Sequence, residues 1–279
     1  MRLNCAGREL DLSSPVLMGV LNVTPDSFSD GGRFVDLSAA LDHAERMIDA
    51  GAAIIDVGGE STRPGAAPVS ADEEIHRVLP IIEALVSRGA RVSVDTSKPE
   101  VIRAALSVGV HLVNDVRALQ SPGALEAAAA GSAAICLMHM QGTPVSMQHS
   151  PTYGDVVLEV TEFLKDRVDA CLAMGVGRDR LLVDPGFGFG KTLEHNLALL
   201  RGLPKIAADT GLPILAGLSR KSMLSGLTGR AVHERLAGSL ALAFAALDGG
   251  ARIIRCHDVA ETCDVVKVWA AVRGRGGVA

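Results

Sequence analysis

The sequence predicts an α/β fold, a closed (β/α)8 TIM barrel with a short N-terminal flap or hairpin. Eight short runs of aliphatic and β-branched residues recur along the 279 residues, and segments with a 3.6-residue apolar period lie between them. Continuous apolar runs are typical of parallel strands buried on both faces. Eight strand–helix repeats in about 250 residues match a closed barrel, and a doubly wound open sheet is the alternative with the same alternation.

The predicted elements follow one another without a linker or low-complexity tract, which favours a single domain over residues 1–279. The N-terminal segment alternates too weakly for a barrel strand, so we expect residues 1–14 to form the flap or hairpin beneath the barrel. Helical periodicity is clearest over 75–86 and 156–172, and residues 274–279 are predicted to be a frayed tail. The runs predicted as strands are 16–23, 53–57, 91–94, 111–113, 133–138, 181–183, 213–216 and 252–254.

Composition and charge argue against several classes of protein. The chain carries 27 Lys and Arg against 32 Asp and Glu, a formal charge of −5, without a long basic cluster, so we expect no nucleic-acid partner. The longest strongly apolar stretch, 236–247, falls short of the ~20 residues that span a bilayer. Five cysteines without a C-x-x-C pair suit a reducing compartment. We therefore expect a cytoplasmic protein without a membrane span.

Polar residues follow almost every predicted strand, at the end of a barrel where active sites are built. Asp56 and Asp115 are equally compatible with a functional role and with bracing a loop. The polar residues that follow the strands are Asn22, Asp56, Asp95, Asn114, Asp115, His139, Asp184, Ser219, Arg220, Lys221, Arg255 and His257.

Helix capping is the competing explanation for polar residues at these positions. Ser70, Ser97 and Asp258 each stand three residues before a Glu, the spacing of a capping box. With Ser97 and Asp258 assigned to capping, Asp95 and His257 remain as functional candidates.

Glycine-rich loops follow two of the strands, over 58–65 and 184–192. The second nearly matches a phosphate-binding P-loop, but Pro185 stands where the first glycine is required, so we reject that interpretation. The sequence contains no G-x-G-x-x-G after the first strand, no H-E-x-x-H and no G-x-S-x-G. A third loop, 24–34, carries two phenylalanines among polar residues and is predicted to be a lid, with packing on the barrel rim as the alternative.

The candidate residues have a common chemical character. Asp95, Asn114 and Asp184 should converge in the barrel mouth, where a buried carboxylate requires a partner. A heterocycle with adjacent N–H groups, such as a 2-aminopyrimidinone, offers such a carboxylate two donors. Cationic residues around them suit an anion, so a flat heterocycle with a phosphorylated end would satisfy both sets. These cations are Arg63, Lys221, Arg255 and His257.

Several motifs resemble those of the dihydropteroate synthase family of the folate pathway. The segments 18–32 (MGVLNVTPDSFSDGG) and 56–65 (DVGGESTRPG) resemble its two opening signatures and are long enough to be highly specific. The resemblance spans about residues 15–270, and it departs at Cys256, where bacterial members commonly carry Val. Further agreement occurs at 94–96, 113–115, 184–191, 219–222 and 255–258.

This resemblance implies an enzyme that condenses 7,8-dihydropterin-6-ylmethyl diphosphate with 4-aminobenzoate, giving 7,8-dihydropteroate and pyrophosphate. It also implies Mg²⁺ as cofactor and a homodimer. Diphosphate would leave first, and Asp95, Lys221 and Arg255 would be the catalytic residues. Sulfonamides, which imitate 4-aminobenzoate in this family, would be inhibitors.

The resemblance further implies which residues hold each part of the substrates. Asn22 would bind the Mg²⁺ ion, and the 4-aminobenzoate carboxylate would meet the N-terminus of the helix that Ser222 opens. The pterin residues would be Asp95, Asn114, Asp184, Lys221 and Arg255; the diphosphate residues Asn22, Arg63, Arg255 and His257; and the 4-aminobenzoate residues Phe28, Thr62, Arg63, Pro64, Phe189, Lys221 and Ser222.

Two alternatives share part of this pattern. A pterin-binding methyltetrahydrofolate methyltransferase would share the Asp and Asn contacts but would not need the 24–34 loop or an anion cluster with Mg²⁺. A non-catalytic pterin-binding protein would not need Asn22, Lys221 and Arg255 together. For the homodimer, the apolar helices around 236–247 and 259–272 are the expected interface.

Overall fold

The computed structural model describes residues 1–23, 33–61, 68–142, 147 and 151–274. Eight parallel strands pair in chain order into a barrel, and a bridge between Val183 and Ile214 joins the last open edge. The prediction of a closed barrel is therefore confirmed, and the open sheet is excluded. The barrel strands are β3 (Val16–Asn22), β4 (Ala52–Gly58), β5 (Val92–Asp95), β6 (Leu112–Asp115), β7 (Ala134–Met138), β8 (Leu181–Asp184), β9 (Leu215–Gly217) and β10 (Ile253–Cys256).

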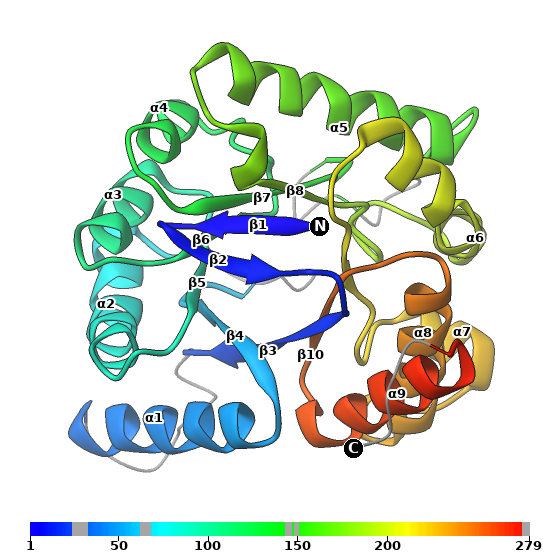
Figure 1. The fold of residues 1–279 in the computed structure, drawn as a ribbon, viewed down its shortest axis with the longest axis horizontal. Coiled ribbons are helices and arrows are strands. Elements are labelled where there is room, and N and C mark those ends of the chain that lie inside the picture. The colour runs from blue at the N-terminus through cyan, green and yellow to red at the C-terminus, as the bar shows by residue number, and fades with distance from the viewer. Residues whose placement is uncertain (24–32, 62–67, 143–146, 148–150, 275–279) are drawn as a thin grey trace.

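Helices form a ring around the barrel (Figure 1). The two segments with the clearest predicted periodicity, 75–86 and 156–172, lie within α2 and α5. Their apolar faces pack on the outer surface of the strands in one continuous core. The helices are α1 (Arg33–Asp49), α2 (Ala71–Ser87), α3 (Pro99–Ser107), α4 (Ala124–Ala129), α5 (Val156–Ala173), α6 (Leu193–Thr210), α7 (Met223–Thr228), α8 (Leu236–Asp248) and α9 (Val259–Val272), with 3-10 turns η2 (Arg178–Arg180) and η3 (Val232–Glu234).

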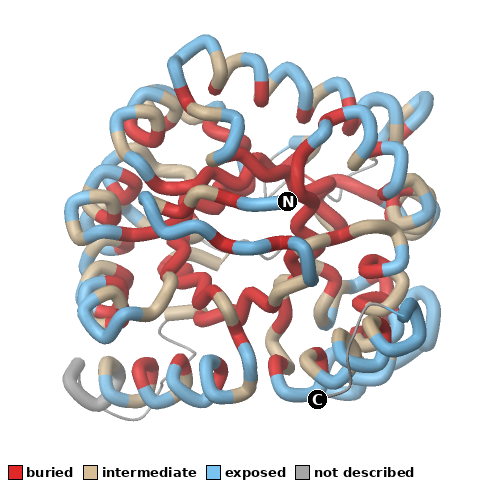
Figure 2. Tube along the Cα trace, viewed as in Figure 1, coloured by how far each residue is buried: buried red, intermediate tan, exposed pale blue. Residues whose placement is uncertain are grey.

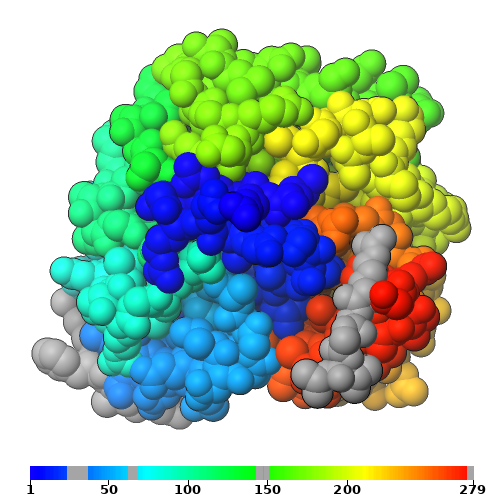
Figure 3. Space-filling model, viewed as in Figure 1, coloured from blue at the N-terminus to red at the C-terminus, as the bar shows by residue number. Residues whose placement is uncertain are grey.

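The N-terminal segment is the predicted hairpin, formed by antiparallel β1 (Arg2–Cys5) and β2 (Arg8–Asp11). It crosses the amino-terminal end of the barrel, where Figure 3 shows it over the centre of this face. Buried and exposed residues both occur along the hairpin (Figure 2), and the apolar residues of its two strands are the buried ones. Those side chains form a second core with the barrel interior: Leu3, Cys5, Leu10 and Leu12 pack with Met18, Ile54, Leu112, Ala134, Cys136, Leu182, Leu215 and Ile253.

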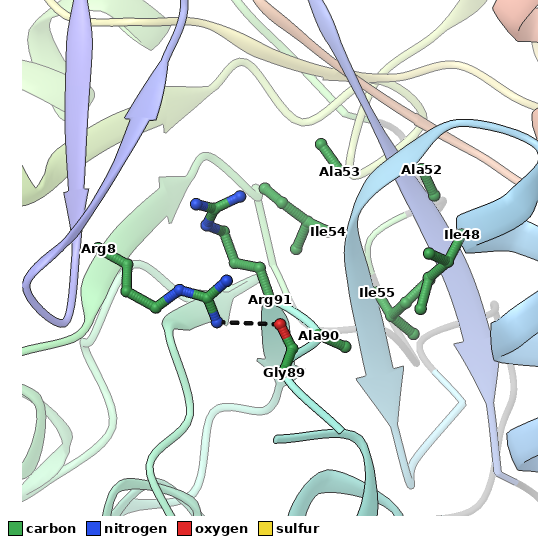
Figure 4. Close-up of a pocket in the computed structure, with 9 residues that line it drawn as sticks. All are labelled: Arg8, Ile48, Ala52, Ala53, Ile54, Ile55, Gly89, Ala90 and Arg91. Carbon is green, nitrogen blue, oxygen red and sulfur yellow. Dashed lines mark hydrogen bonds between the residues drawn. The ribbon is translucent and has the colours of Figure 1, made fainter. Parts of the chain in front are cut away.

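A hollow of about 190 Å³ lies beside the hairpin at this same end (Figure 4). Arg8 and Arg91 line it with the first residues of β4, and Arg8 Nη1 donates to the Gly89 carbonyl at 3.1 Å. The hollow therefore lies at the end of the barrel opposite the polar strand ends, and it is not part of the predicted site.

Helix capping differs from the prediction at two of three positions. Ser70 caps α2 as expected, since its Oγ accepts a hydrogen bond from the Glu73 N–H at 3.2 Å. Lys98, and not Ser97, is the N-cap of α3, and the Ser97 hydroxyl donates to the Asp115 carboxylate. Asp258 is the N-cap of α9 but makes no side-chain capping bond, because its carboxylate accepts from the Arg220 guanidinium. The prediction of capping boxes at Ser97 and Asp258 is wrong because both side chains have tertiary partners.

No helix in the described ranges is both long and apolar enough to cross a membrane.

Candidate active site

The carboxyl ends of four neighbouring strands bring their polar residues to one level of the barrel. Asn22 of β3 is in register with Gly58 of β4, which is in register with Asp95 of β5 and through it with Asn114 of β6. A Cβ built on Gly58 would lie 3.8 Å from both Asn22 Oδ1 and Asp95 Oδ2. The glycine therefore leaves open space between an amide and a carboxylate.

Arg255, on β10, links the acidic side chains of this mouth. Its Nε donates to Asp56 Oδ2 at 2.6 Å, and its Nη2 donates to Asp95 Oδ2 at 2.8 Å. Asn114 Nδ2 donates to the same Asp56 oxygen at 3.0 Å. Burial acts to lower the pKa of Arg255, but the negative charges of Asp56 and Asp95 have the larger combined effect. The net result is a raised pKa. Asp56 thus has a bracing role, as it orients both Arg255 and Asn114 from below.

The two acids predicted to face the heterocycle have environments that favour their neutral forms. Burial raises the pKa of Asp95 to about 7, against the opposing charge of Arg255. Burial also raises the pKa of Asp184, although its Oδ1 accepts from the Gly186 N–H at 2.7 Å. Perturbed carboxyl groups that cluster in a barrel mouth are typical of an active site.

Lys221 reaches the mouth from the loop after β9. Its Nζ donates to the Phe187 carbonyl at 2.6 Å and lies 4.1 Å from the centre of the Phe189 ring. Burial lowers the pKa of Lys221 to about 8, with the charge of Asp184 acting in the opposite direction. The structure therefore places Lys221, Phe189 and Asp184 around one space.

The other predicted residues divide into those with a described position and those without. His257 Nδ1 lies 3.0 Å from Ser219 Oγ just after β10, and Ser222 is the exposed N-cap of α7. Cys256 is buried in the outer core among the helices, so its side chain faces away from the mouth. Phe28, Thr62, Arg63 and Pro64 lie outside the described residues.

Supporting residues surround these candidates, and two of them, Lys98 and Lys191, were not identified as site residues from the sequence. Asp115 braces the loop after β6, because it accepts from the Arg117 and Leu119 N–H groups at 2.8 Å each. Lys98 bridges Glu60, at 2.7 Å, and the fully buried Glu74 of α2. Lys191 is buried below the Gly186–Phe189 loop. Asp115 was identified as a possible loop brace because it follows a predicted strand. The Lys98 bridges and the contact of Lys191 with His139 join distant segments.

The donor set suits a metal ion that is shared with a phosphorylated ligand. The described residues contain no cluster of three or more His, Cys, Asp or Glu side chains that could hold an ion by themselves. Mg²⁺ keeps several waters and takes one or two protein oxygens together with substrate phosphates. The Asn22 amide oxygen, beside the space above Gly58, fits that mode of binding.

A (β/α)8 barrel with paired acids and amides in its mouth and cations around them defines the class of protein. The family model described as pterin binding enzyme matches residues 18–257, and the chain belongs to this family.

Individual relatives agree with this assignment. The dihydropteroate synthase of Escherichia coli K12 is 54% identical over 272 residues, which cover 97% of this chain and 96% of the relative. The structure of Yersinia pestis dihydropteroate synthase in complex with a sulfonamide drug superposes with a TM-score of 0.93 at 52% identity, covering 98% of this chain and all of that one. The Burkholderia cenocepacia dihydropteroate synthase in complex with 7,8-dihydropteroate gives a TM-score of 0.89 at 47% identity, covering 98% of this chain and 96% of that one.

Proposed function

We propose that this chain catalyses the condensation of 7,8-dihydropterin-6-ylmethyl diphosphate with 4-aminobenzoate to 7,8-dihydropteroate and pyrophosphate. The observation that carries the proposal is the convergence of Asp95, Asn114, Asp184, Lys221 and Arg255 at the carboxyl ends of the strands. Relatives about half identical in sequence over nearly the whole chain are dihydropteroate synthases, and one of them holds 7,8-dihydropteroate. The enzyme is thus a transferase of folate biosynthesis.

The pterin edge would be recognised by the deepest residues of the mouth. Asp184 Oδ1 accepts from the Gly186 N–H at 2.7 Å, and within the described ranges Oδ2 has no hydrogen bond and would accept from the ring N–H groups. Asn114 is held by Asp56, which leaves its amide oxygen to accept from the heterocycle. Lys221 donates to the ring carbonyl or ring nitrogen, and the Arg255 guanidinium can lie against the pterin face. Each of these contacts meets a polar atom of the ring that would otherwise be buried without a partner.

The diphosphate would occupy the open space above Gly58. Asn22 would hold the Mg²⁺ ion, and Arg63, Arg255 and His257 would supply the surrounding positive charge. The bound ion would neutralise the charge that develops on the departing diphosphate.

The chemistry requires little from a nucleophilic side chain. The bond between the methylene carbon and the diphosphate oxygen breaks with both electrons going to the oxygen, which leaves a methylene cation conjugated with the dihydropterin ring. Asp95 stabilises that cation, and Arg255 holds Asp95 in position through the 2.8 Å bond. The free amine of 4-aminobenzoate then attacks the methylene carbon and loses its proton to water. Positioning and charge complementarity therefore dominate catalysis.

The 4-aminobenzoate ring would lie against Phe189, between Lys221 and Ser222, with the rim formed by Phe28, Thr62, Arg63 and Pro64. Because the pterin lies deepest, we expect negligible binding of 4-aminobenzoate to the empty enzyme and clear binding when pterin, pyrophosphate and Mg²⁺ are present. Calorimetry with and without pyrophosphate checks this order, and tight binding to the free protein would contradict it. A sulfonamide should compete with 4-aminobenzoate for the same space.

The proposed function is tested by release of pyrophosphate from the pterin diphosphate, assayed with and without 4-aminobenzoate. Release that depends on 4-aminobenzoate supports the condensation. A methyltetrahydrofolate methyltransferase or a non-catalytic pterin-binding protein would bind pterin but release no pyrophosphate.

We also propose that the protein is a homodimer through α7, α8 and α9, which lie together in Figure 1. Among the described residues, exposed large apolar side chains gather on this segment. Light scattering should give twice the chain mass of 28.9 kDa, and Val268→Asp should lower it. A monomeric wild-type chain would contradict the dimer. The exposed apolar residues are Leu227, Val232, Leu236, Val268 and Val272.

A further inference from the structure

Lys191 is a buried cation that has no role in the proposed reaction as described so far. The residue is only 3% exposed and lies just before α6. Burial lowers the pKa of its ammonium group to about 7, and the charge of Asp184 opposes this shift. An isolated buried ammonium group is costly unless its donors are satisfied, so the question is what holds it.

The partners of Lys191 come from the ends of two neighbouring barrel strands. Its Nζ lies 2.9 Å from the Gly186 carbonyl, 2.9 Å from the Phe189 carbonyl and 2.9 Å from His139 Nδ1, with the His139 carbonyl at 3.3 Å. Burial and the charge of Lys191 lower the pKa of His139 to about 3, so its Nδ1 is free to accept. The ammonium group thus fastens the loop after β8 to the first residue after β7.

The loop that encloses Lys191 is a glycine-rich turn in which the Phe189 N–H donates to the Gly186 carbonyl at 3.1 Å. Gly186, Gly188 and Gly190 all have positive φ, and a Cβ on Gly186 would collide with the His139 carbonyl. Asn196 Oδ1 accepts from the Gly188 N–H at 2.7 Å, and the Tyr153 hydroxyl donates to the Gly190 carbonyl at 2.8 Å. Lys191 is the residue that satisfies two carbonyls of the loop at once.

The outer side of this loop faces the substrate space. It presents the Phe187 carbonyl, which accepts from Lys221 at 2.6 Å, and the Phe189 ring, which lies 4.1 Å from Lys221 Nζ. The loop also supplies the Gly186 N–H that holds Asp184. Both of these contacts of the Lys221 ammonium group are therefore made with the loop that Lys191 closes.

We infer that Lys191 is a positioning residue for the proposed reaction: it fixes the Gly186–Phe189 loop from behind and thereby sets the position of Lys221 and Asp184 at the pterin. The inference rests on the proposed function, because Lys221 and Asp184 are its pterin residues. Lys191 itself touches neither substrate. Small displacements of aligned groups are sufficient to slow a reaction that depends on positioning.

The first experiment compares Lys191→Met with Lys205→Met in the pyrophosphate-release assay. Lys205 is a matched control because it lies on α6, is exposed and forms an ion pair with Asp209 at the surface. We expect Lys191→Met to lower kcat/KM for the pterin diphosphate about tenfold to a hundredfold, and Lys205→Met to leave it unchanged. Wild-type kcat/KM in a folded Lys191→Met variant would overturn the inference.

A double-mutant cycle with Lys221→Met separates positioning from a general loss of stability. If Lys191 acts through Lys221, the double variant should be little slower than Lys221→Met alone. The reason is that Lys221→Met already removes the ammonium group that Lys191 positions. Because Lys191 is inferred to position Asp184 as well, the same cycle is run with Asp184→Asn. Losses that multiply in both cycles would show independent action and overturn the inference.

Folding is checked by circular dichroism at the assay temperature. If Lys191→Met does not fold, the cycle uses Lys191→Gln, whose amide keeps two N–H donors on a shorter side chain. A wild-type chain that releases no pyrophosphate would count against the proposed function only. Calorimetric binding of the pterin diphosphate to wild type and to the Lys191 variant would then decide the role of Lys191: equal affinities overturn it.

Discussion

Asp184 illustrates how one carboxylate can serve both the fold and a ligand. One oxygen holds the Gly186 N–H, so the turn that begins the Gly186–Phe189 loop forms whether or not substrate is present. The other oxygen faces the mouth. Ligand binding by this side chain should therefore be sensitive to an isosteric substitution.

Asp184→Asn should weaken binding of the pterin diphosphate at least about tenfold. The substitution places an amide where a carboxylate would accept N–H groups of the ring, and an unsatisfied buried polar group costs ~1–3 kcal/mol. Titration calorimetry on the folded variant measures the loss, with Asp209→Asn on the exposed side of α6 as control. Unchanged affinity would remove Asp184 from the pterin site.

The acid limb of the pH profile should belong to Asp95. Burial raises the pKa of this carboxyl group to about 7, so its charged form, which stabilises the proposed cation, is lost as the pH falls through 7. We expect kcat/KM to fall below pH 7 in wild type and to be low but nearly independent of pH there in Asp95→Asn, because kcat/KM reports groups of the free enzyme. An acid limb that persists in the variant would assign it to another group.

At the scale of single elements, the strands could be predicted because their signal is local. The run 181–183 corresponds to Leu181–Asp184, and the run 16–23 to Val16–Asn22. Strands buried on both faces are mostly apolar, so their position is visible in the sequence. Polar residues at or near the ends of several strands, among them Asn22, Asp95 and Asp184, then identify the mouth.

Contacts between elements could not be predicted in the same way. Ser97 has the spacing of a capping residue, yet its hydroxyl donates to Asp115, 18 residues further on. Lys191 stands in a glycine-rich segment that is compatible with an exposed loop, and its contacts with the ring and the carbonyl of His139 join it to a residue 52 positions away. Pairings between distant segments decide these side chains, and a single sequence does not contain that information in local form.

The Lys98 bridge gives a prediction at this scale. Lys98 precedes α3 and binds Glu60 in the loop after β4 and the fully buried Glu74 of α2, so it joins three elements. Lys98→Met should lower the free energy of unfolding by ~2 kcal/mol, because Glu74 would keep a buried carboxylate without its partner. Urea denaturation measures this loss.

A second change tests the cause of that loss. Glu74→Gln added to Lys98→Met removes the buried charge and should restore part of the stability. Equal stability of the single and double variants would show that the bridge contributes little. Lys267→Met, an exposed pair on α9, serves as control.

In the whole molecule, residues that stabilise the fold and residues of the proposed site lie at opposite ends of the barrel. The amino-terminal end is closed by the hairpin, whose apolar side chains complete the barrel interior. The carboxyl end carries the acids, amides and cations of the proposed site. In barrels of this kind the residues at the first end serve stability and those at the second serve chemistry.

This division predicts opposite effects of two substitutions. Leu3→Ala, at a fully buried position of the hairpin, should lower the free energy of unfolding by ~2–5 kcal/mol, since it removes buried carbon atoms and leaves a cavity. It should change kcat/KM less than about twofold at a temperature where the variant is folded, since the structure around such a cavity relaxes only partially. Asn114→Ala should lower kcat/KM about a hundredfold while costing only ~1 kcal/mol of stability, the net value of a typical hydrogen bond. Urea denaturation and initial rates are measured on both variants, with Leu158→Ala on the exposed side of α5 as reference. A loss of activity in folded Leu3→Ala comparable to that in Asn114→Ala would show that the two ends of the barrel are coupled.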